Sequence, residues 1–126
     1  MLSNEEAVAT IAVKDAKRAQ KFYEETLGLH PEPAREAGVL SYRTGPSTIL
    51  VYESVFAGTN KATAATWVVA DVDEVVQDLK KKGVAFEHYD LPGITRRGDV
   101  HVSGGTRAAW FKDPDGNILN VVNQSA

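Results

Sequence analysis

The sequence contains no cysteine among its 126 residues, which excludes disulfide bonds and thiolate chemistry. No apolar run approaches the roughly 20 residues needed to span a membrane. The 14 basic residues are outnumbered by 17 acidic ones, so nothing in the net charge of −3 attracts nucleic acid or an anionic membrane. The acidic N-terminus lacks the basic start and apolar core of a signal peptide. These absences favour a cytoplasmic protein with no nucleic acid and no membrane as partners.

What is present is typical of a globular protein. Hydrophobic residues make up 43% of the chain and charged residues 25%. A chain of this length suits one domain or two very small halves.

The stretch near the C-terminus carries the clearest local signal. Residues 108–112 form a short apolar run with aromatics, and residues 118–123 form another. Between them, Asp113-Pro114-Asp115-Gly116 offers turn residues in the order that a bulged hairpin requires. The pattern predicts a β-hairpin. Because a hairpin cannot bury its own face, it must complete a sheet begun elsewhere in the chain.

The first half predicts a strand, a helix and further strands. Asp15 suits a helix cap and Gly28 suits the position after a helix end. Two prolines keep residues 30–33 out of a central strand. The expected elements are a strand over 8–13, a helix from 15 to 27, an edge strand around 34–36, and strands over 39–43 and 48–53.

The second half repeats this order. Asp71 and Gly83 correspond to Asp15 and Gly28 and follow them by about 56 residues. The chain therefore contains an internal repeat of β, α, β, β, β. The lysines at 80–82 suit the last turn of the helix, where the helix dipole favours cations. The expected elements are a linker over 57–65, a strand over 66–70, a helix over 71–82, a strand over 84–89, a long segment over 90–105 and the hairpin.

Several of these pieces together resemble the vicinal-oxygen-chelate superfamily, the glyoxalase, bleomycin resistance protein and dioxygenase type. The pieces are residues 11–15, 21–29 with Phe-Tyr and Leu-Gly, the aspartate-led second helix, and 111–118 with Asp-Pro-Asp-Gly-Asn. The resemblance implies an α+β fold of two βαβββ modules that form half-barrel concave sites. It covers residues 1–126 as a single domain, with module one at about 6–56, a linker at about 57–63 and module two at about 64–124. Members of the superfamily are commonly dimers.

The resemblance also implies four positions for metal ligands, and this sequence departs from the family pattern there. The positions fall on Val8, Val51, Ala64 and Asn120, and a register slip would replace Val51 by Tyr52 or Glu53. Valine and alanine cannot bind a metal, and one asparagine is a poor ligand for a divalent cation. We therefore expect no metal and no cofactor, which argues against glyoxalase I, extradiol dioxygenase and metal-dependent fosfomycin transferase chemistry. Trp110 replaces a proton-transferring tyrosine of some dioxygenases.

Strand alternation predicts which side chains line the concave faces. Ile11, Val13, Trp67 and Val69 are expected beneath the helices. The expected lining comprises Val8, Thr10, Ala12, Ile49, Val51, Glu53, Ala64, Thr66, Val68, Ala108, Trp110, Lys112, Ile118, Asn120 and Val122. Such a mostly apolar cavity with few polar groups is typical of a small-molecule site.

Seven residues are candidates for contact with a ligand: Thr10, Glu53, Thr66, His101, Arg107, Trp110 and Asn120. Trp110 is either a stacking surface for a planar ligand or plain core packing. Glu53 is a buried acid, a partner for a cation or a solvated strand end. His101 and Arg107, with the charged residues 96, 97 and 99, form either a lid that clamps an anion or a solvent-exposed loop.

The leading hypothesis is a metal-independent homodimer that binds or sequesters a small organic ligand in an apolar, aromatic-lined cavity. The alternative is a lyase or isomerase of the same superfamily that acts through Glu53 or His101. A metal held by ligands that the pattern does not identify belongs to that alternative.

Overall fold

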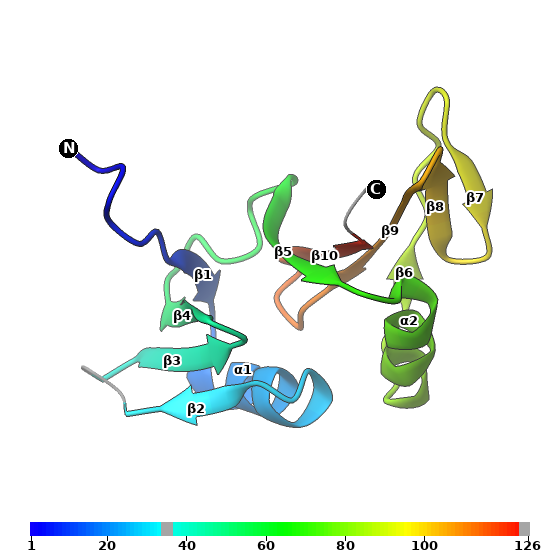
Figure 1. The fold of residues 1–126 in the computed structure, drawn as a ribbon. Coiled ribbons are helices and arrows are strands. Elements are labelled where there is room, and N and C mark those ends of the chain that lie inside the picture. The colour runs from blue at the N-terminus through cyan, green and yellow to red at the C-terminus, as the bar shows by residue number, and fades with distance from the viewer. Residues whose placement is uncertain (34–36, 124–126) are drawn as a thin grey trace. The chain divides into compact units, whose positions relative to one another are not determined.

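The computed structural model describes residues 1–33 and 37–123. The chain divides into two compact units, Met1–Gly58 and Thr59–Ala126, and each carries helical turns against one face of a β-sheet (Figure 1). Over the described residues both sheets are open rather than curled. The combination of helices and sheets confirms the α+β class, whereas the half-barrels that the resemblance implied are not formed by the described residues. No helix within this part of the chain combines the length and apolar character that crossing a bilayer needs.

The first unit contains a four-stranded sheet in the order β1-β4-β3-β2. Its elements are β1 (Ala9–Val13), α1 (Ala16–Gln20), the π-helical η1 (Lys21–Thr26), β2 (His30–Glu32), β3 (Val39–Thr44) and β4 (Ser47–Glu53). Strands β1 and β4 are parallel, and the other pairs are antiparallel. The proline-containing β2 lies at the edge, as its missing donors require. The edge strand expected around 34–36 lies outside the described residues.

The helical segment begins and ends where its sequence signals lie. The Asp15 carboxylate accepts a hydrogen bond from the Lys17 N–H at 2.9 Å, and Gly28 adopts a φ of +72°. Tyr23 is fully buried and stacks on Tyr42 of β3, with ring centroids 6.1 Å apart. These rings tie the helical segment to the sheet.

The register of β4 corrects the predicted lining of this unit. Val51 is the partner of Ile11 in parallel pairing, so both side chains lie on the same face. Tyr42, on that face, donates its hydroxyl hydrogen to Glu24 of η1 at 2.8 Å, which shows that the face is the one beneath the helix. The expectation that Ile49, Val51 and Glu53 face away from the helix is wrong, and Leu50 and Tyr52 take that side.

The second unit repeats the pattern with an added hairpin. Its elements are β5 (Thr63–Val69), α2 (Val72–Lys81), β6 (Phe86–Glu87), β7 (Thr95–Arg97), β8 (Val100–Ser103), β9 (Thr106–Lys112) and β10 (Ile118–Asn123). The strand order is β5-β10-β9-β8-β7, and β6 also pairs with β9. The Asp71 carboxylate caps α2 by accepting from the Glu74 N–H at 3.1 Å. Strand β5 begins three residues earlier than expected, within the predicted linker.

The segment 90–105 is not the long loop that its glycines and proline suggested. Strands β7 and β8 pair antiparallel across a turn at Gly98, and β8 continues the sheet by pairing with β9. His101 therefore lies within a sheet strand, and its side chain is only 2% exposed. The expectation that His101 lies in a lid or a solvent-exposed loop is wrong, whereas residues 90–93 are exposed and lie outside the strands.

The predicted closing hairpin is confirmed. The buried Asp113 carboxylate accepts hydrogen bonds from the Asp115 and Asn117 N–H groups, both at 2.9 Å, and from the Asn117 amide at 2.8 Å. Gly116 adopts a φ of +89°, which only glycine tolerates without strain. The turn fixes β9 and β10 in the register that pairs Trp110 with Asn120.

Candidate functional site

The second sheet has two chemically different faces. Phe111, Leu119 and Val121 alternate with Trp110 and Asn120 along β9 and β10, and these three apolar side chains are at most 3% exposed. α2 contacts both strands. Trp110 and Asn120 therefore point away from the closely packed apolar layer.

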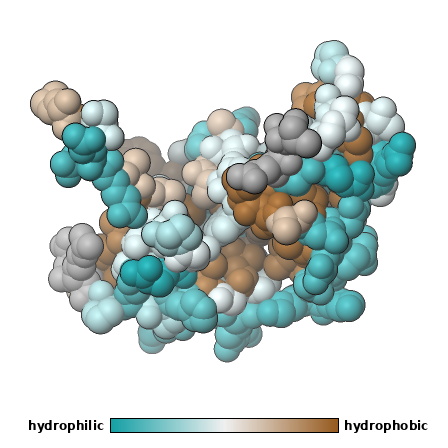
Figure 2. Space-filling view, viewed as in Figure 1, coloured by the Kyte–Doolittle hydropathy of each residue, from teal (hydrophilic) through white to brown (hydrophobic). Residues whose placement is uncertain are grey.

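An ion pair shows on which face α2 lies. Arg107 of β9 shares the alternation of Phe111, and its guanidinium binds the Asp73 carboxylate of α2 through two hydrogen bonds of 3.0 and 2.9 Å. The face that carries Trp110 is thus the one opposite α2, which we call the open face. Figure 2 shows apolar residues gathered around β5 and β10, while polar residues cover the outer surface of α2.

Three rings meet on the open face and form what we call the aromatic cluster. The ring of Trp110 lies edge-on to His101, with centroids 4.9 Å apart, and edge-on to Tyr89 at 5.4 Å. Tyr89 and His101 lie 5.9 Å apart. The Trp110 Nε1–H donates to the Thr63 hydroxyl of β5 at 3.2 Å, which fixes the orientation of the indole.

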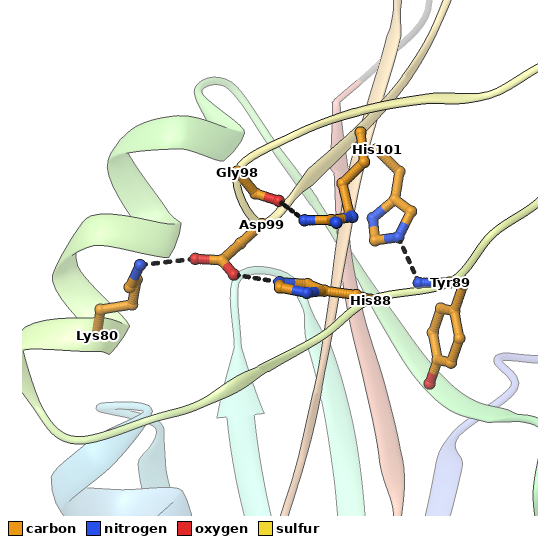
Figure 3. Close-up of polar contacts among 7 residues, drawn as sticks. Lys80, His88, Tyr89, Gly98, Asp99 and His101 are labelled. Carbon is orange, nitrogen blue, oxygen red and sulfur yellow. Dashed lines mark hydrogen bonds and ion pairs between the residues drawn. The ribbon is translucent and has the colours of Figure 1, made fainter.

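The tautomer of the neutral imidazole follows from its hydrogen bond with Tyr89. The backbone N–H of Tyr89 lies 2.9 Å from Nε2 of His101 (Figure 3). A backbone N–H can only donate, so Nε2 accepts and the proton of the neutral ring is on Nδ1. That Nδ1 is the single buried side-chain nitrogen or oxygen without a hydrogen-bond partner in the described part of the chain.

Charged groups border the aromatic cluster. Glu87 of β6 pairs with Trp110 and forms an ion pair of 3.2 Å with Lys112. Burial raises the pKa of the Tyr89 phenol, Glu87 raises it further, and Lys112 opposes them. The phenol therefore stays protonated at neutral pH and retains a hydrogen-bond donor.

Asn120 lies beside Trp110 but is engaged by the sheet itself. Its amide nitrogen donates to the Ala109 carbonyl at 3.0 Å and to the Val121 carbonyl at 3.3 Å. Thr66 of β5 is the partner of Asn120 on the other side and is exposed on the open face.

Of the seven candidate residues, the structure brings four together on the open face: Thr66, His101, Trp110 and Asn120. Arg107 lies on the opposite face in its pair with Asp73, so the expected clamp with His101 is not formed. Thr10 and Glu53 belong to the first unit, where Glu53 lines an open depression of about 520 Å³ with Lys14, Ser54 and Val55. The binding roles of all seven stay predictions.

A network beside the aromatic cluster connects the turn between β7 and β8 to α2. Asp99 forms 2.7 Å contacts with both Lys80 of α2 and His88 (Figure 3). The Lys80 ammonium, and then His88, hold the pKa of the Asp99 carboxyl below its usual value. This network positions the segment that carries Tyr89.

The residues at the implied metal positions do not fit a divalent cation. Val8 is exposed, Val51 lies beneath the helix, and Ala64 is the extra residue where the pairing of β5 with β10 shifts register. Asn120 directs its amide nitrogen at backbone carbonyls. Across residues 1–33 and 37–123, no group of three or more His, Cys, Asp or Glu side chains is placed to hold a metal ion.

A family model described as Glyoxalase/Bleomycin resistance protein/Dioxygenase superfamily matches residues 7–121. The chain belongs to this superfamily. No curated protein matches this superfamily member in sequence.

Solved structures share the superfamily fold at low identity. The fosfomycin resistance protein FosX of Listeria monocytogenes is 17% identical, with a TM-score of 0.73 over 98% of this chain and 95% of that one. TnmS3, an antibiotic binding protein of Streptomyces sp. CB03234, is 22% identical, with a TM-score of 0.65 over 97% and 98%. A lactoylglutathione lyase of Agrobacterium tumefaciens is 16% identical, with a TM-score of 0.70 over 94% and 93%. At these identities the likeness establishes the fold alone.

Sequence reasoning missed Tyr89, Glu87 and Thr63. Tyr89 follows a strand of only two residues, and Thr63 lay in the predicted linker. The pairing of Glu87 with Trp110 follows from β6 sharing an edge of β9 with β8, which no local pattern reveals.

Proposed function

We propose that this superfamily member binds a small planar organic ligand at the aromatic cluster, without a metal. The observation that carries the proposal is the meeting of Trp110, Tyr89 and His101 on the open face. Aromatic rings offer a large apolar contact area at low cost in conformational entropy, and a few polar groups fix a ligand's orientation. We expect the Thr63 hydroxyl and the Glu87–Lys112 pair to supply those polar groups.

Catalysis through the predicted acid–base residues has less support. A general base needs a free lone pair within reach of the substrate, but the lone pair of His101 already accepts from the Tyr89 N–H. Glu53 is exposed and belongs to the other unit. The similarity of the fold to that of TnmS3, an antibiotic binding protein, supports a binding function.

The two tryptophans provide a matched test because they lie on opposite faces of one sheet. Trp67 is the partner of Val121 on the face of α2, and Trp110 is the partner of Asn120 on the open face. A panel of uncharged fused-ring aromatic compounds is titrated calorimetrically into the wild type, Trp110→Ala and the control Trp67→Phe. We expect Trp110→Ala to weaken binding about tenfold, from the loss of ring contact, and Trp67→Phe to leave the dissociation constant unchanged.

Two results would count against the proposal. If no compound of the panel gives a heat of binding with the wild-type protein, the proposal that it binds planar ligands is wrong. Equal weakening by both substitutions shows that the ligand does not discriminate between the faces, so the aromatic cluster is not the site. Circular dichroism of both variants establishes that each is folded before binding is compared.

The homodimer and the cytoplasmic location are also proposals. Val55 and Phe56, adjacent in sequence, are 86% and 74% exposed, and exposed apolar groups of this kind support self-association. Sedimentation velocity is expected to give twice the mass of 13.6 kDa for the wild type and a smaller species for Phe56→Ser.

A further inference from the structure

The aromatic cluster contains an unsatisfied donor that plain core packing does not explain. His101 is 2% exposed, and its Nδ1 has no partner although the ring is surrounded by protein. Leaving a buried polar group unpaired is costly, and native structures almost always pair such groups. An acceptor that is not part of the protein therefore suits this position.

The orientation of the donor is fixed by the fold. His101 is the partner of Ala108 in β8–β9 pairing, and its Nε2 is held by the Tyr89 N–H. Edge-on contact with Trp110 restricts the ring further. The imidazole cannot turn to satisfy Nδ1 without losing the hydrogen bond at Nε2, so the Nδ1–H remains available.

We propose that the planar ligand carries a hydrogen-bond acceptor on its ring edge, a ring nitrogen or a carbonyl oxygen, and that His101 Nδ1–H donates to it. This rests on the proposed function and names the ligand class: heteroaromatic or carbonyl-bearing planar compounds rather than plain hydrocarbons. Because Nδ1 is buried, the proposal requires that a side chain covering it moves when the ligand binds.

A pair of probes isolates the hydrogen bond. Quinoline and naphthalene have the same shape, but only quinoline has a ring nitrogen, which is unprotonated at neutral pH and accepts a hydrogen bond. We expect quinoline to bind the wild-type protein about fivefold to tenfold more tightly, as one net hydrogen bond provides. Equilibrium dialysis gives both dissociation constants under identical conditions.

Two substitutions separate the nitrogens of the imidazole. His101→Gln places an amide oxygen near the position of Nε2, where it accepts from the Tyr89 N–H, and leaves no donor at the position of Nδ1. His101→Asn places an amide N–H near Nδ1 and loses the acceptor for Tyr89. We expect the preference for quinoline to disappear in His101→Gln and to persist in His101→Asn.

The outcomes distinguish this inference from the proposed function. If quinoline and naphthalene bind the wild type equally, a buried water or nothing satisfies Nδ1, and the inference is wrong while binding stands. If neither probe binds, the proposed function fails as well. If His101→Gln does not fold, the wild-type probe pair and His101→Asn still decide the question: loss of the preference in His101→Asn contradicts a role for Nδ1.

Discussion

Substitution of Asp113 is expected to destabilise the second unit more than any surface change nearby. The Asp113 carboxylate is 4% exposed and accepts three hydrogen bonds, two of them from backbone N–H groups of the closing turn. Asp113→Ala removes this acceptor from all three donors, which are buried or part-buried. Hydrogen bonds to a charged group contribute about 1.5–3 kcal/mol each, but the turn is partly hydrated once opened, so we expect a total loss of about 3 kcal/mol.

Urea unfolding followed by tryptophan fluorescence measures this loss. Asp113→Asn is the matched control, because its side-chain oxygen keeps the two backbone bonds while its NH₂ opposes the amide of Asn117. We expect this variant to lose about 1 kcal/mol of unfolding free energy. For both variants, the slope of the unfolding free energy against urea concentration should equal that of the wild type. A loss below about 1 kcal/mol for Asp113→Ala would refute the claim that this carboxylate organises the turn.

Three further predictions concern other contacts, each measured by urea unfolding. Asp99→Asn should cost about 1 kcal/mol at neutral pH. Because the pKa of Asp99 is lowered in the folded protein, Asp99 contributes fully to the free energy of unfolding at pH values well above 3.8, and this contribution disappears as the pH falls through the lowered pKa. A difference in stability between the wild type and Asp99→Asn that stays constant with pH would contradict this. Arg107→Ala should cost under about 1 kcal/mol through its pair with Asp73 and leave ligand binding unchanged. Tyr42→Phe should lower the free energy of unfolding by about 1 kcal/mol, because Glu24 loses the hydrogen bond from the Tyr42 hydroxyl.

Much of the fold could be predicted because its boundaries depend on local chemistry. Asp15 and Asp71 satisfy the first N–H groups of helices, and Gly116 is the residue that the turn backbone requires. Which side chains of β4 face the helix could not be predicted, because residues 49–51 are all apolar and show no alternation of apolar and polar residues. Strand β7 was missed because all three of its residues are exposed.

The candidate site was predictable only in part. Trp110 and Asn120 follow from strand alternation across a hairpin whose turn was clear. The role expected for Arg107 depended on its neighbours in sequence, whereas its partner Asp73 lies 34 residues away. The burial of His101 follows from pairing of β8 with β9, and its contact with Tyr89 joins positions 12 residues apart. Long-range pairing decides these contacts, and composition does not reveal it.

The measurement that tests the central claim most directly is the indole N–H region of a ¹⁵N-correlated NMR spectrum during titration with quinoline. The protein contains two tryptophans, and Trp67→Phe assigns their two signals. We predict that the Trp110 signal shifts and saturates while the Trp67 signal stays in place, because the rings lie on opposite faces of the sheet. Saturating movement of the Trp67 signal alone, or no movement of either, would contradict binding at the aromatic cluster.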